Sequence, residues 1–337
     1  MKKNKLIDGL VLTQHFHQLH AELSSPVIPQ GIAHAQLLQK NNQVAQLLGL
    51  NAEVVDSQAF LDVFSGNALL ANSSPVACAY AGHQLGNFNP FLGDGRSVLL
   101  GELSSPAGNW DVGLKGSGKT AYTFSADGRA SIDECLHEDI VSERLAQLDV
   151  PTTRSLCVIK GSEKVYRSGF KAVAILARIA PSFVRFGSFE YCYFKKDTNA
   201  LKALADYVIK RHFADCLGAN DDNNYAQFFY QVVEKTAALI ASWQNVGFVH
   251  GMMNTDNQSI VGITLDLGES VFIDNQDYDF VASPSDEHGR YAYGQQPVIG
   301  LWNCNVLARA LSPLISSNDL KRGLSIYERT YLDHLMI

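Results

Sequence analysis

The sequence lacks the cysteine spacings that bind zinc and the long apolar runs that cross membranes. Its 337 residues hold no C-x-x-C pair, and the six cysteines are spread out, at Cys78, Cys135, Cys157, Cys192, Cys216 and Cys304. We therefore expect buried thiols in a reducing compartment, with neither a zinc site nor a disulfide framework. A run of about eighteen apolar residues, which a membrane span needs, is also absent.

The first residues do not form a convincing secretory signal. They are basic, but Asp8, Gln14, His15 and His17 interrupt any apolar stretch that follows. Because a signal peptide needs an unbroken apolar segment, we expect a cytoplasmic protein with no membrane partner.

Charge is sparse and mostly acidic. Charged residues make up 18% of the chain, and 27 basic against 34 acidic side chains give a net charge of -7. Such a chain repels a nucleic-acid backbone, so we expect no nucleic-acid partner, although a local basic pocket for a small polyphosphate is compatible with this charge. The hydrophobic content of 46% excludes a disordered chain and predicts a packed core.

Hydrophobic periodicity predicts strands and one helix first, then mainly helices. Predicted helices cover 8–20, 36–48, 130–148, 198–214, 224–247 and 301–311. Predicted strands cover 97–103, 110–115, 154–160, 164–168 and 172–179, with a hairpin turn at 106–109. Residues 75–96, rich in glycine, asparagine and proline, are expected to be irregular and functional. This order predicts a two-lobed α+β fold, in which a cleft is a common ligand site.

Oxygen-bearing side chains follow the predicted helix 224–247. Asn254, Asp256 and Asn257 come just after His250-Gly251, and Asp266 follows. An asparagine oxygen and one carboxylate can hold magnesium, while a second carboxylate accepts a proton from a hydroxyl. Protein kinases place these roles in a comparable loop. Simple Asx turns would explain the same residues equally well.

Three further groups could contact phosphates. Lys115 ends a predicted strand and Glu138 lies in the next helix, as in the lysine–glutamate pair of kinases; a surface lysine and a solvated glutamate are the plainer alternative. The segment 93–96, Gly-Asp-Gly-Arg, could approach a phosphate or form an ordinary turn. Arg178 and Arg185 could clamp a polyphosphate or simply be solvated.

Residues 113–120, Gly-Leu-Lys-Gly-Ser-Gly-Lys-Thr, match the Walker A pattern. That motif works only where a helix begins at its Lys-Thr end and points at the phosphates. The residues after Thr120 are polar, include Gly128 and show no apolar stripe before about residue 130. The sequence therefore predicts that Lys119 is not part of a P-loop.

Several longer segments together resemble the selenoprotein O family. They occur in the family's order, and the resemblance extends from near residue 15 to about residue 311. The segments are 80–90, 92–96, 114–118, 126–129, 180–187, 249–257 and 289–297.

The resemblance implies a protein-kinase-like fold that binds ATP in reversed orientation and transfers AMP to serine, threonine or tyrosine hydroxyls of proteins, releasing pyrophosphate. It implies magnesium, or manganese, as cofactor, and ATP and hydroxyl-bearing proteins as partners. It also implies three parts: an N-terminal helical extension (1–75), a strand-rich nucleotide-binding lobe (76–195) and a helical lobe (196–337). Family members continue further, so we expect the last lobe to be C-terminally truncated.

The resemblance also implies roles for single residues. Lys115 and Glu138 correspond to the ion pair, Asp256 to the proton acceptor, and Asn257 and Asp266 to the metal ligands. The nucleotide contacts correspond to Gly93, Gly95, Arg96, Lys115, Asp127, Gly128, Arg178, Arg185 and Asp266. The sequence departs from the family pattern at Lys119, Ala121 and Phe124, and Lys119 alone creates the Walker match.

Three alternatives stay open at this point. The chain could transfer a phosphoryl group as a conventional kinase, hydrolyse nucleotide through a P-loop, or bind nucleotide without catalysis. The protein acceptor and the choice between ATP and UTP as donor are likewise open.

Overall fold

The structure is a computed structural model that describes residues 4–7, 9–71, 73–218 and 224–336. It is a mixed α/β protein built around a large, mainly antiparallel sheet. The chain forms two compact units, each made of several segments. Unit 1 comprises Met1–Ala79, Leu92–Glu143 and Thr153–Ser182, and unit 2 comprises Tyr80–Phe91, Arg144–Thr152 and Phe183–Ile337.

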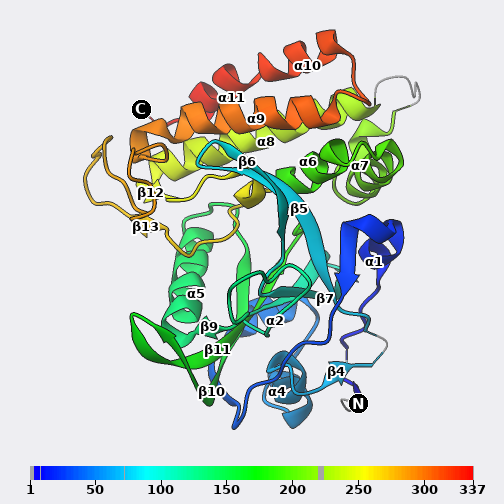
Figure 1. Ribbon diagram of the computed structural model, residues 1–337, viewed down its shortest axis with the longest axis vertical. Helices are drawn as coiled ribbons and strands as arrows, with labels where there is room; N and C mark the ends of the chain where they lie inside the picture. Colours follow the sequence, from blue (N-terminus) through cyan, green and yellow to red (C-terminus); the bar gives the residue numbers. More distant parts are fainter. Residues whose placement is uncertain (1–3, 8, 72, 219–223, 337) are drawn as a thin grey trace. The chain divides into compact units, whose positions relative to one another are not determined.

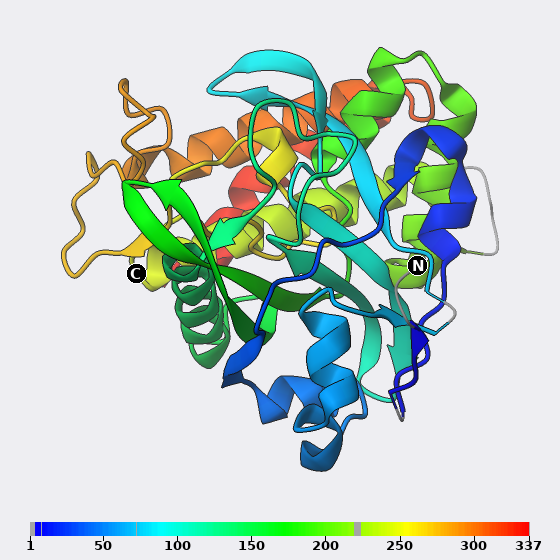
Figure 2. The ribbon, with the colours of Figure 1, turned by 60° about the horizontal axis from the view of Figure 1, so that its bottom comes forward.

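The main sheet has nine strands, seven of them in the continuous order β2-β5-β7-β8-β11-β10-β3, while β6 pairs with β5 and β9 with β11. The long β10–β11 hairpin is green in Figure 2. The strands are β2 (Ser24–Pro26), β3 (Gln36–Lys40), β5 (Val76–Gln84), β6 (Asn87–Gly93), β7 (Ser97–Ser105), β8 (Gly108–Lys115), β9 (Ala130–Ser131), β10 (Arg154–Arg167) and β11 (Gly169–Ala180).

The unit 1 core has two layers, because apolar side chains of the strands point alternately to the two faces of the sheet. On β11, Val173, Ile175, Ala177 and Ile179 join the larger apolar cluster, which also contains residues of the helices α2 (Asn42–Leu47), α3 (Ala52–Val55) and α4 (Gln58–Phe64). The residues between them, Ala174 and Leu176, join a smaller cluster with Cys135 of α5 (Ile132–Gln147). Because neighbouring side chains on a strand point to opposite faces, helices cover both faces of the sheet.

Short helices of unit 1 begin at residues that satisfy their first backbone N–H groups. The side-chain oxygens of Asn41, Asn51 and Ser57 accept hydrogen bonds at the starts of α2, α3 and α4. Such N-caps typically contribute about 1 kcal/mol each. Unit 1 also holds α1 (His15–Leu19), the 3-10 turn η1 (Ala21–Leu23), and the pair β1 (Asn4–Lys5) and β4 (Leu69–Leu70).

Unit 2 is mainly helical. In it α8 contacts α9, α10 and α11, and α6 contacts α7 and α9 (Figure 1). The helices are α6 (Phe186–Phe194), α7 (Thr198–His212), α8 (Asn224–Asn245), α9 (Gln296–Leu311), α10 (Ser317–Leu324) and α11 (Tyr327–His334), with 3-10 turns η2 (Ala214–Cys216), η4 (Thr255–Asn257) and η5 (Tyr293–Gln295), and the short strands β12 (Phe248–Val249) and β13 (Val271–Phe272).

Most of the long predicted elements are confirmed. The helices predicted at 130–148, 198–214, 224–247 and 301–311 are α5, α7, α8 and α9, and the strands predicted at 97–103, 110–115 and 172–179 are β7, β8 and β11. The strands predicted at 154–160 and 164–168 are one strand, β10, with a register shift between Lys160 and Lys164. All six cysteines are buried free thiols, as expected.

Three predictions are wrong. Residues 36–48 are not one helix, because Gln36–Lys40 pair with β10 as β3 before Asn41 caps α2. Within the predicted helix 8–20 only His15–Leu19 are α-helical, and residue 8 lies outside the described residues. The segment 75–96 is a β5–β6 hairpin, whose two-residue loop has positive φ at Leu85 (49°) and Gly86 (84°).

Among the described residues, no helix has both the length and the apolar character that a membrane span requires.

We expect Gly187→Ala to destabilise the protein by up to about 2 kcal/mol, because overpacking costs about 1–3 kcal/mol and the gain in helix propensity returns only about 1 kcal/mol. Gly187 lies in the first turn of α6, where a Cβ atom would overlap the carbonyl oxygen of Ala81 and come within 3.2 Å of the Asp256 Cα. Urea denaturation measures the change. The control is Gly218→Ala, where a Cβ meets nothing within 4 Å; equal effects of the two substitutions would contradict this packing.

Candidate active site

Glu138 joins two cations in the interior of unit 1. Its carboxylate forms an ion pair with the Lys115 ammonium through Oε2, and its Oε1 lies 2.7 Å from Nη1 of Arg178. The relative exposures of Glu138, Lys115 and Arg178 are 1%, 8% and 4%. A charge can be buried this deeply only when it is paired, so these three side chains are folded as one group. The predicted Lys115–Glu138 pair is present.

The sheet register explains why the three meet. Val112 and Leu114 of β8 belong to the larger apolar cluster, so Lys115 points to the opposite face, where α5 packs. Lys115 pairs with Leu176 of β11, and Arg178 is two residues further along that strand. Both cations therefore lie on the face of the sheet that carries Glu138.

The glycine turn before β7 is closed over by the loop that follows β8. A Cβ atom at Gly93 would overlap the Tyr122 ring, and one at Gly95 would lie 3.2 Å from the Tyr122 carbonyl oxygen. The Thr120 hydroxyl donates to the carbonyl oxygen of Asp94 at 2.6 Å. Gly93 is therefore needed for the close approach of this loop, and Gly95 eases it.

The Walker-like segment is not a P-loop. Residues 113–115 are the end of β8, the fully described residues 116–129 contain no helix, and α5 begins only at Ile132. Gly118 donates its N–H to the Gly128 carbonyl oxygen at 2.9 Å, and a Cβ atom at Gly128 would overlap Gly118. The glycines of this segment therefore pack two turns together, and Lys119 does not begin a helix as the motif requires.

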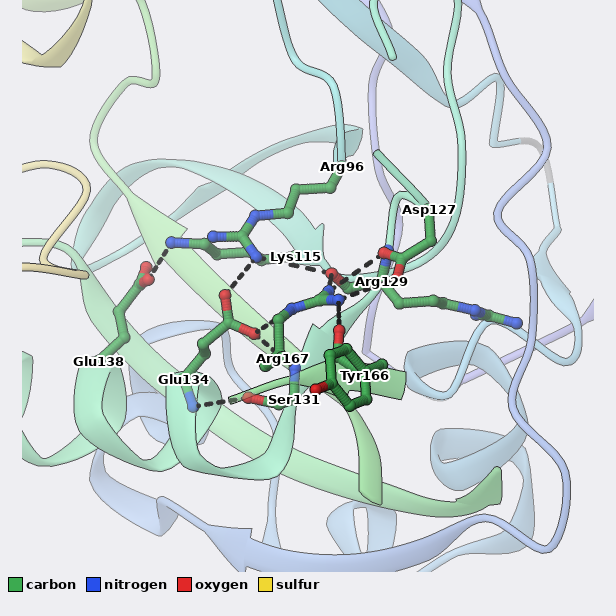
Figure 3. A network of polar contacts seen from close by, with 9 residues as sticks. All are labelled: Arg96, Lys115, Asp127, Arg129, Ser131, Glu134, Glu138, Tyr166 and Arg167. Atoms are coloured by element: carbon green, nitrogen blue, oxygen red, sulfur yellow. Dashed lines mark hydrogen bonds and ion pairs between the residues drawn. The ribbon is translucent and has the colours of Figure 1, made fainter. Parts of the chain in front are cut away.

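Two further ion pairs hold Arg96 and Asp127 (Figure 3). Arg96 lies 2.6 Å from Glu134, and Arg167 binds both oxygens of Asp127, at 2.9 and 3.1 Å. The Arg167 Nε is also 3.5 Å from Glu134. Glu134 thus lies between the two arginines, and one network fixes two of the residues that the resemblance assigns to nucleotide contact.

The network shifts both carboxylates toward the ionised form. Hydrogen bonding from Arg167 is the main cause that lowers the pKa of Asp127 from 3.8 to about 2. Burial acts to raise the pKa of Glu134, but the charge and hydrogen bond of Arg96 outweigh it and lower the value from 4.5 to about 2. Both acids are therefore ionised throughout the neutral range.

The sequence predictions did not include Glu134 and Arg167. The sequence did contain a local signal for Glu134, because Ser131 and Glu134 have the spacing of a capping box at the start of α5. In this box the Ser131 N–H donates to the Glu134 carboxylate at 2.7 Å, and the Glu134 N–H donates to the Ser131 hydroxyl at 3.3 Å. Arg167 gives no such signal, since its partners lie some forty residues away and depend on the β10–β11 hairpin.

In unit 2, the loop after α8 is held by a buried histidine. The ring of His250 bonds to the Leu265 carbonyl oxygen at 2.8 Å, and its backbone N–H donates to Gln296 at 2.9 Å. Burial lowers the pKa of His250, so the ring is neutral near pH 7. We conclude that His250 positions this loop rather than acting as an acid or base.

The Asp256 carboxylate is buried and only partly hydrogen-bonded. Its Oδ2 accepts a hydrogen bond from Gln84 at 3.2 Å, whereas its buried Oδ1 has no hydrogen-bond partner in the described part of the chain. Burial raises the pKa of Asp256 from 3.8 to about 6, with Arg185 and Gln84 opposing the shift. A Cβ atom at Gly82 would lie 2.5 Å from Oδ1. Gly82 therefore leaves a space beside Oδ1 that the side chain of any other residue would fill.

Two asparagines of the loop have structural partners. The Asn254 oxygen accepts hydrogen bonds from the Tyr291 hydroxyl at 2.7 Å and the Leu85 N–H at 3.2 Å. Asn257 donates its amide N–H to the Met252 carbonyl oxygen at 2.9 Å, so the nitrogen is engaged and the oxygen is the atom that a ligand would use.

Arg185 connects the loop to Asp266. It donates to the Asp256 carbonyl oxygen at 2.6 Å, forms an ion pair with Asp266, and lies over the Tyr80 ring at 4.8 Å. Asp266 has a φ of 55°, a conformation that is uncommon outside glycine and recurs at functional sites. The predicted residues Arg185, Asp256 and Asp266 thus lie together in unit 2.

The described residues contain no group of three or more His, Cys, Asp or Glu side chains that could hold a metal by themselves. Magnesium does not need such a group, because it is commonly bound by one or two carboxylates plus substrate phosphates and water. Asp266 and Asn257 supply the kinds of oxygen that it prefers, so the donor set fits a divalent metal bound together with a nucleotide.

We expect Asp256→Asn to stabilise the metal-free protein at high pH but not at low pH. The folded protein holds the proton on Asp256 more tightly than the unfolded chain, since the pKa rises from 3.8 to about 6. Stability is therefore lost as pH rises through this window, by up to about 3 kcal/mol. In urea denaturation with a chelator at about pH 8, the free energy of unfolding of the variant should exceed that of the unaltered protein by about 1–3 kcal/mol. At about pH 4 the two free energies of unfolding should be equal. A destabilised variant at high pH would refute the assigned environment.

We expect Arg167→Gln to raise the pKa of Asp127 from about 2 toward 3.8, because the bidentate hydrogen bonds are lost. Carboxyl-carbon NMR of labelled aspartates measures the titration directly. Lys202→Gln is the matched control, since Lys202 pairs with Asp206 on the exposed side of α7. An unchanged Asp127 titration would show that Arg167 does not hold it.

Comparison with known proteins identifies the family of this chain. The profile of the family described as protein adenylyltransferase SelO matches residues 8–336. Relatives called protein nucleotidyltransferase YdiU from Pseudomonas aeruginosa (strain LESB58), Pseudomonas fluorescens (strain Pf0-1) and Pseudomonas entomophila (strain L48) are 43%, 40% and 41% identical over 333 residues. The alignments cover 98% of this chain and 68% of each relative. The resemblance found in the sequence is confirmed: the chain belongs to the SelO family of protein nucleotidyltransferases.

Proposed function

We propose that this chain transfers AMP from ATP to serine, threonine or tyrosine hydroxyls of proteins and releases pyrophosphate. The observation that carries the proposal is the environment of Asp256: a buried carboxylate with one unpartnered oxygen and a pKa raised to about 6, in the loop that also holds Asn257. Membership of the SelO family supports the same chemistry. We also propose a two-lobed kinase-like fold with parts at 1–75, 76–195 and 196–337.

In this proposal Asp256 is the general base. A carboxylate with a pKa of about 6 is ionised near pH 7 and yet basic enough to share a hydroxyl proton in the transition state. The acceptor oxygen attacks the α-phosphorus, the bond from that phosphorus to the oxygen bridging to the β-phosphate breaks, and pyrophosphate leaves. Gln84, which donates to Asp256 Oδ2 at 3.2 Å, keeps the second oxygen oriented.

The cations of unit 1 are proposed to bind the phosphates. Lys115 and Arg178 are fixed by Glu138, so little conformational entropy is lost when an anion binds them. Arg96 is held by Glu134 and Asp127 by Arg167. Gly93, Gly95 and Gly128 are proposed to contact the nucleotide through their backbone, and Arg185 to oppose the charge of departing pyrophosphate.

Asn257 and Asp266 are proposed to hold magnesium, or manganese, through their side-chain oxygens. When bound, the metal supplies positive charge that neutralises the phosphate oxygens. Arg185 already forms an ion pair with Asp266, so the carboxylate is oriented before nucleotide arrives. The left-handed backbone at Asp266, with φ of 55°, is proposed to direct this carboxylate.

Intact-protein mass spectrometry after incubation with ATP and magnesium tests the reaction. We expect a gain of one or more adenylyl groups on the chain or on a mixed protein acceptor, and none with Asp266→Ala. A gain of phosphoryl groups would replace the proposal with a conventional kinase. Nucleotide binding without any covalent product, under conditions where a family relative is active, would favour a catalytically inactive binding protein. UTP in place of ATP tests the donor.

A pair of lysine variants separates this site from a P-loop. We expect Lys119→Ala to change transfer less than about threefold, because Lys119 does not begin a helix. Lys115→Ala should reduce transfer by at least about a hundredfold, since it removes a buried phosphate-binding charge and leaves Glu138 short of one partner. Thermal melts check that both variants fold. Loss of activity in Lys119→Ala alone would contradict the assignment.

A further inference from the structure

Unit 2 contains a pocket of about 1020 Å³ that the proposed chemistry does not use. It lies between the loop of the β5–β6 hairpin, the segment 279–290 and the start of α9. Its lining includes Leu85, Val298, Trp302, Glu287 and Arg290. It is therefore a space lined by both apolar and polar side chains, with one arginine among them, and it is large enough for a side chain of another protein.

The Arg290 guanidinium lies close to two other parts of unit 2. The indole of Trp302 lies on one side, 4.6 Å from the arginine Cζ. A Cβ atom at Gly86 would lie 3.2 Å from the same Cζ, so the hairpin loop covers the group closely. The backbone is also fixed, because the buried Asp286 carboxylate accepts the N–H groups of Arg290 and Tyr291 at 2.9 and 2.6 Å. Arg290 is thus held in a fixed orientation.

One edge of this guanidinium lacks an acceptor. Nε and Nη2 of Arg290 are buried and have no hydrogen-bond partner among the described residues. These two nitrogens carry the parallel N–H groups that bind a carboxylate through both of its oxygens. Buried charged donors are costly when unsatisfied, so a ligand that supplies two oxygens would satisfy this edge of the guanidinium.

The pocket favours a carboxylate over a phosphate. Asp279 and Glu287 are exposed on its wall, and Asp286 lies beneath it. These acidic groups repel a dianion more strongly than a monoanion. The apolar walls at Leu85 and Val298 suit the carbon chain that a carboxylate of a polypeptide brings with it.

Arg290 is also tied to the loop that holds Asp256. Its neighbour Tyr291 donates its hydroxyl hydrogen to Asn254, two residues before Asp256, at 2.7 Å. The Leu85 N–H bonds to both of these groups, at 3.0 Å to Tyr291 and 3.2 Å to Asn254. Leu85 lines the pocket, and the preceding residue Gln84 contacts Asp256. One hairpin loop therefore borders both the pocket and the candidate base.

We propose that Arg290 is the receptor for a carboxylate of the protein acceptor, so that hydroxyls close to an acidic group are selected for modification. The inference rests on the proposed transfer to proteins, but the binding step can be measured without transfer. The carboxylate comes from an aspartate or glutamate side chain near the hydroxyl or from the C-terminus of the acceptor.

NMR of the arginine Nε–H groups tests the binding directly in the full chain without nucleotide. The probes are matched peptides with one central serine, flanked by glutamate or by glutamine, each with an amidated or a free C-terminus. We expect the Arg290 resonance, assigned by its loss in Arg290→Lys, to shift with the glutamate peptide and not with the amidated glutamine peptide. A shift with only the free C-termini would assign the pocket to chain ends.

Two outcomes would overturn the proposal. The first is an Arg290 resonance that no carboxylate peptide moves. The second is a resonance that pyrophosphate moves and the peptides do not, which would assign Arg290 to the leaving group. Neither outcome depends on whether AMP is transferred, so failure of this inference is distinguishable from failure of the proposed function.

Transfer kinetics give the second test. Arg290→Lys should remove the preference for the glutamate over the glutamine peptide, raising KM for the former about tenfold, because a bidentate charged hydrogen bond is lost. Arg329→Lys, on the exposed surface of α11, should retain the preference. If Arg290→Lys fails to fold, the KM values of the unaltered chain for the glutamate and the glutamine peptide still test the inference. Equal KM values for the two peptides would reject it.

Discussion

Glu138 can stay almost completely buried only because Lys115 and Arg178 both meet its carboxylate. The need to pair this buried carboxylate with two cations constrains several features of unit 1. It fixes the register of β8 against β11, the face of the sheet on which α5 packs, and the rotation of α5 about its axis. A slip of one residue in either strand would turn a cation into the larger apolar core, so the ion group specifies the sheet as much as the sheet positions the ion group.

Unit 2 shows the opposite arrangement around Asp256. Here burial is incompletely compensated: one carboxylate oxygen is bonded to Gln84, the other has no partner among the described residues, and the pKa rises to about 6. Stability is given up where a proton acceptor is needed, while His250, Asn254 and Arg185 hold the surrounding loop rigidly. The residues that position the loop therefore have hydrogen-bond partners, whereas the candidate base has a partner for only one of its two carboxylate oxygens.

The sequence predicted the long helices and central strands because their apolar periodicity is strong. It could not predict the β5–β6 hairpin, since that loop depends on positive φ at Leu85, which contacts from Asn254 and Tyr291 hold in place. The pairing of Gln36–Lys40 with β10 likewise overrides a helical pattern. Among site residues, Lys115, Glu138, Asp256 and Asp266 carried recognisable spacing. Arg167 acts through partners far away in the chain, and the position of Arg290 depends on the distant hairpin loop at Gly86.

The position of the phosphorus atom that is transferred tests the account most directly. The chain would be incubated with a protein acceptor and magnesium, using ATP radiolabelled at the α-phosphate in one sample and at the γ-phosphate in another. If Asp256 directs an acceptor hydroxyl to the α-phosphorus, protein-bound label should appear only from the α-labelled nucleotide, with labelled pyrophosphate released from the other. Protein-bound label from the γ-position would contradict the account and identify phosphoryl transfer.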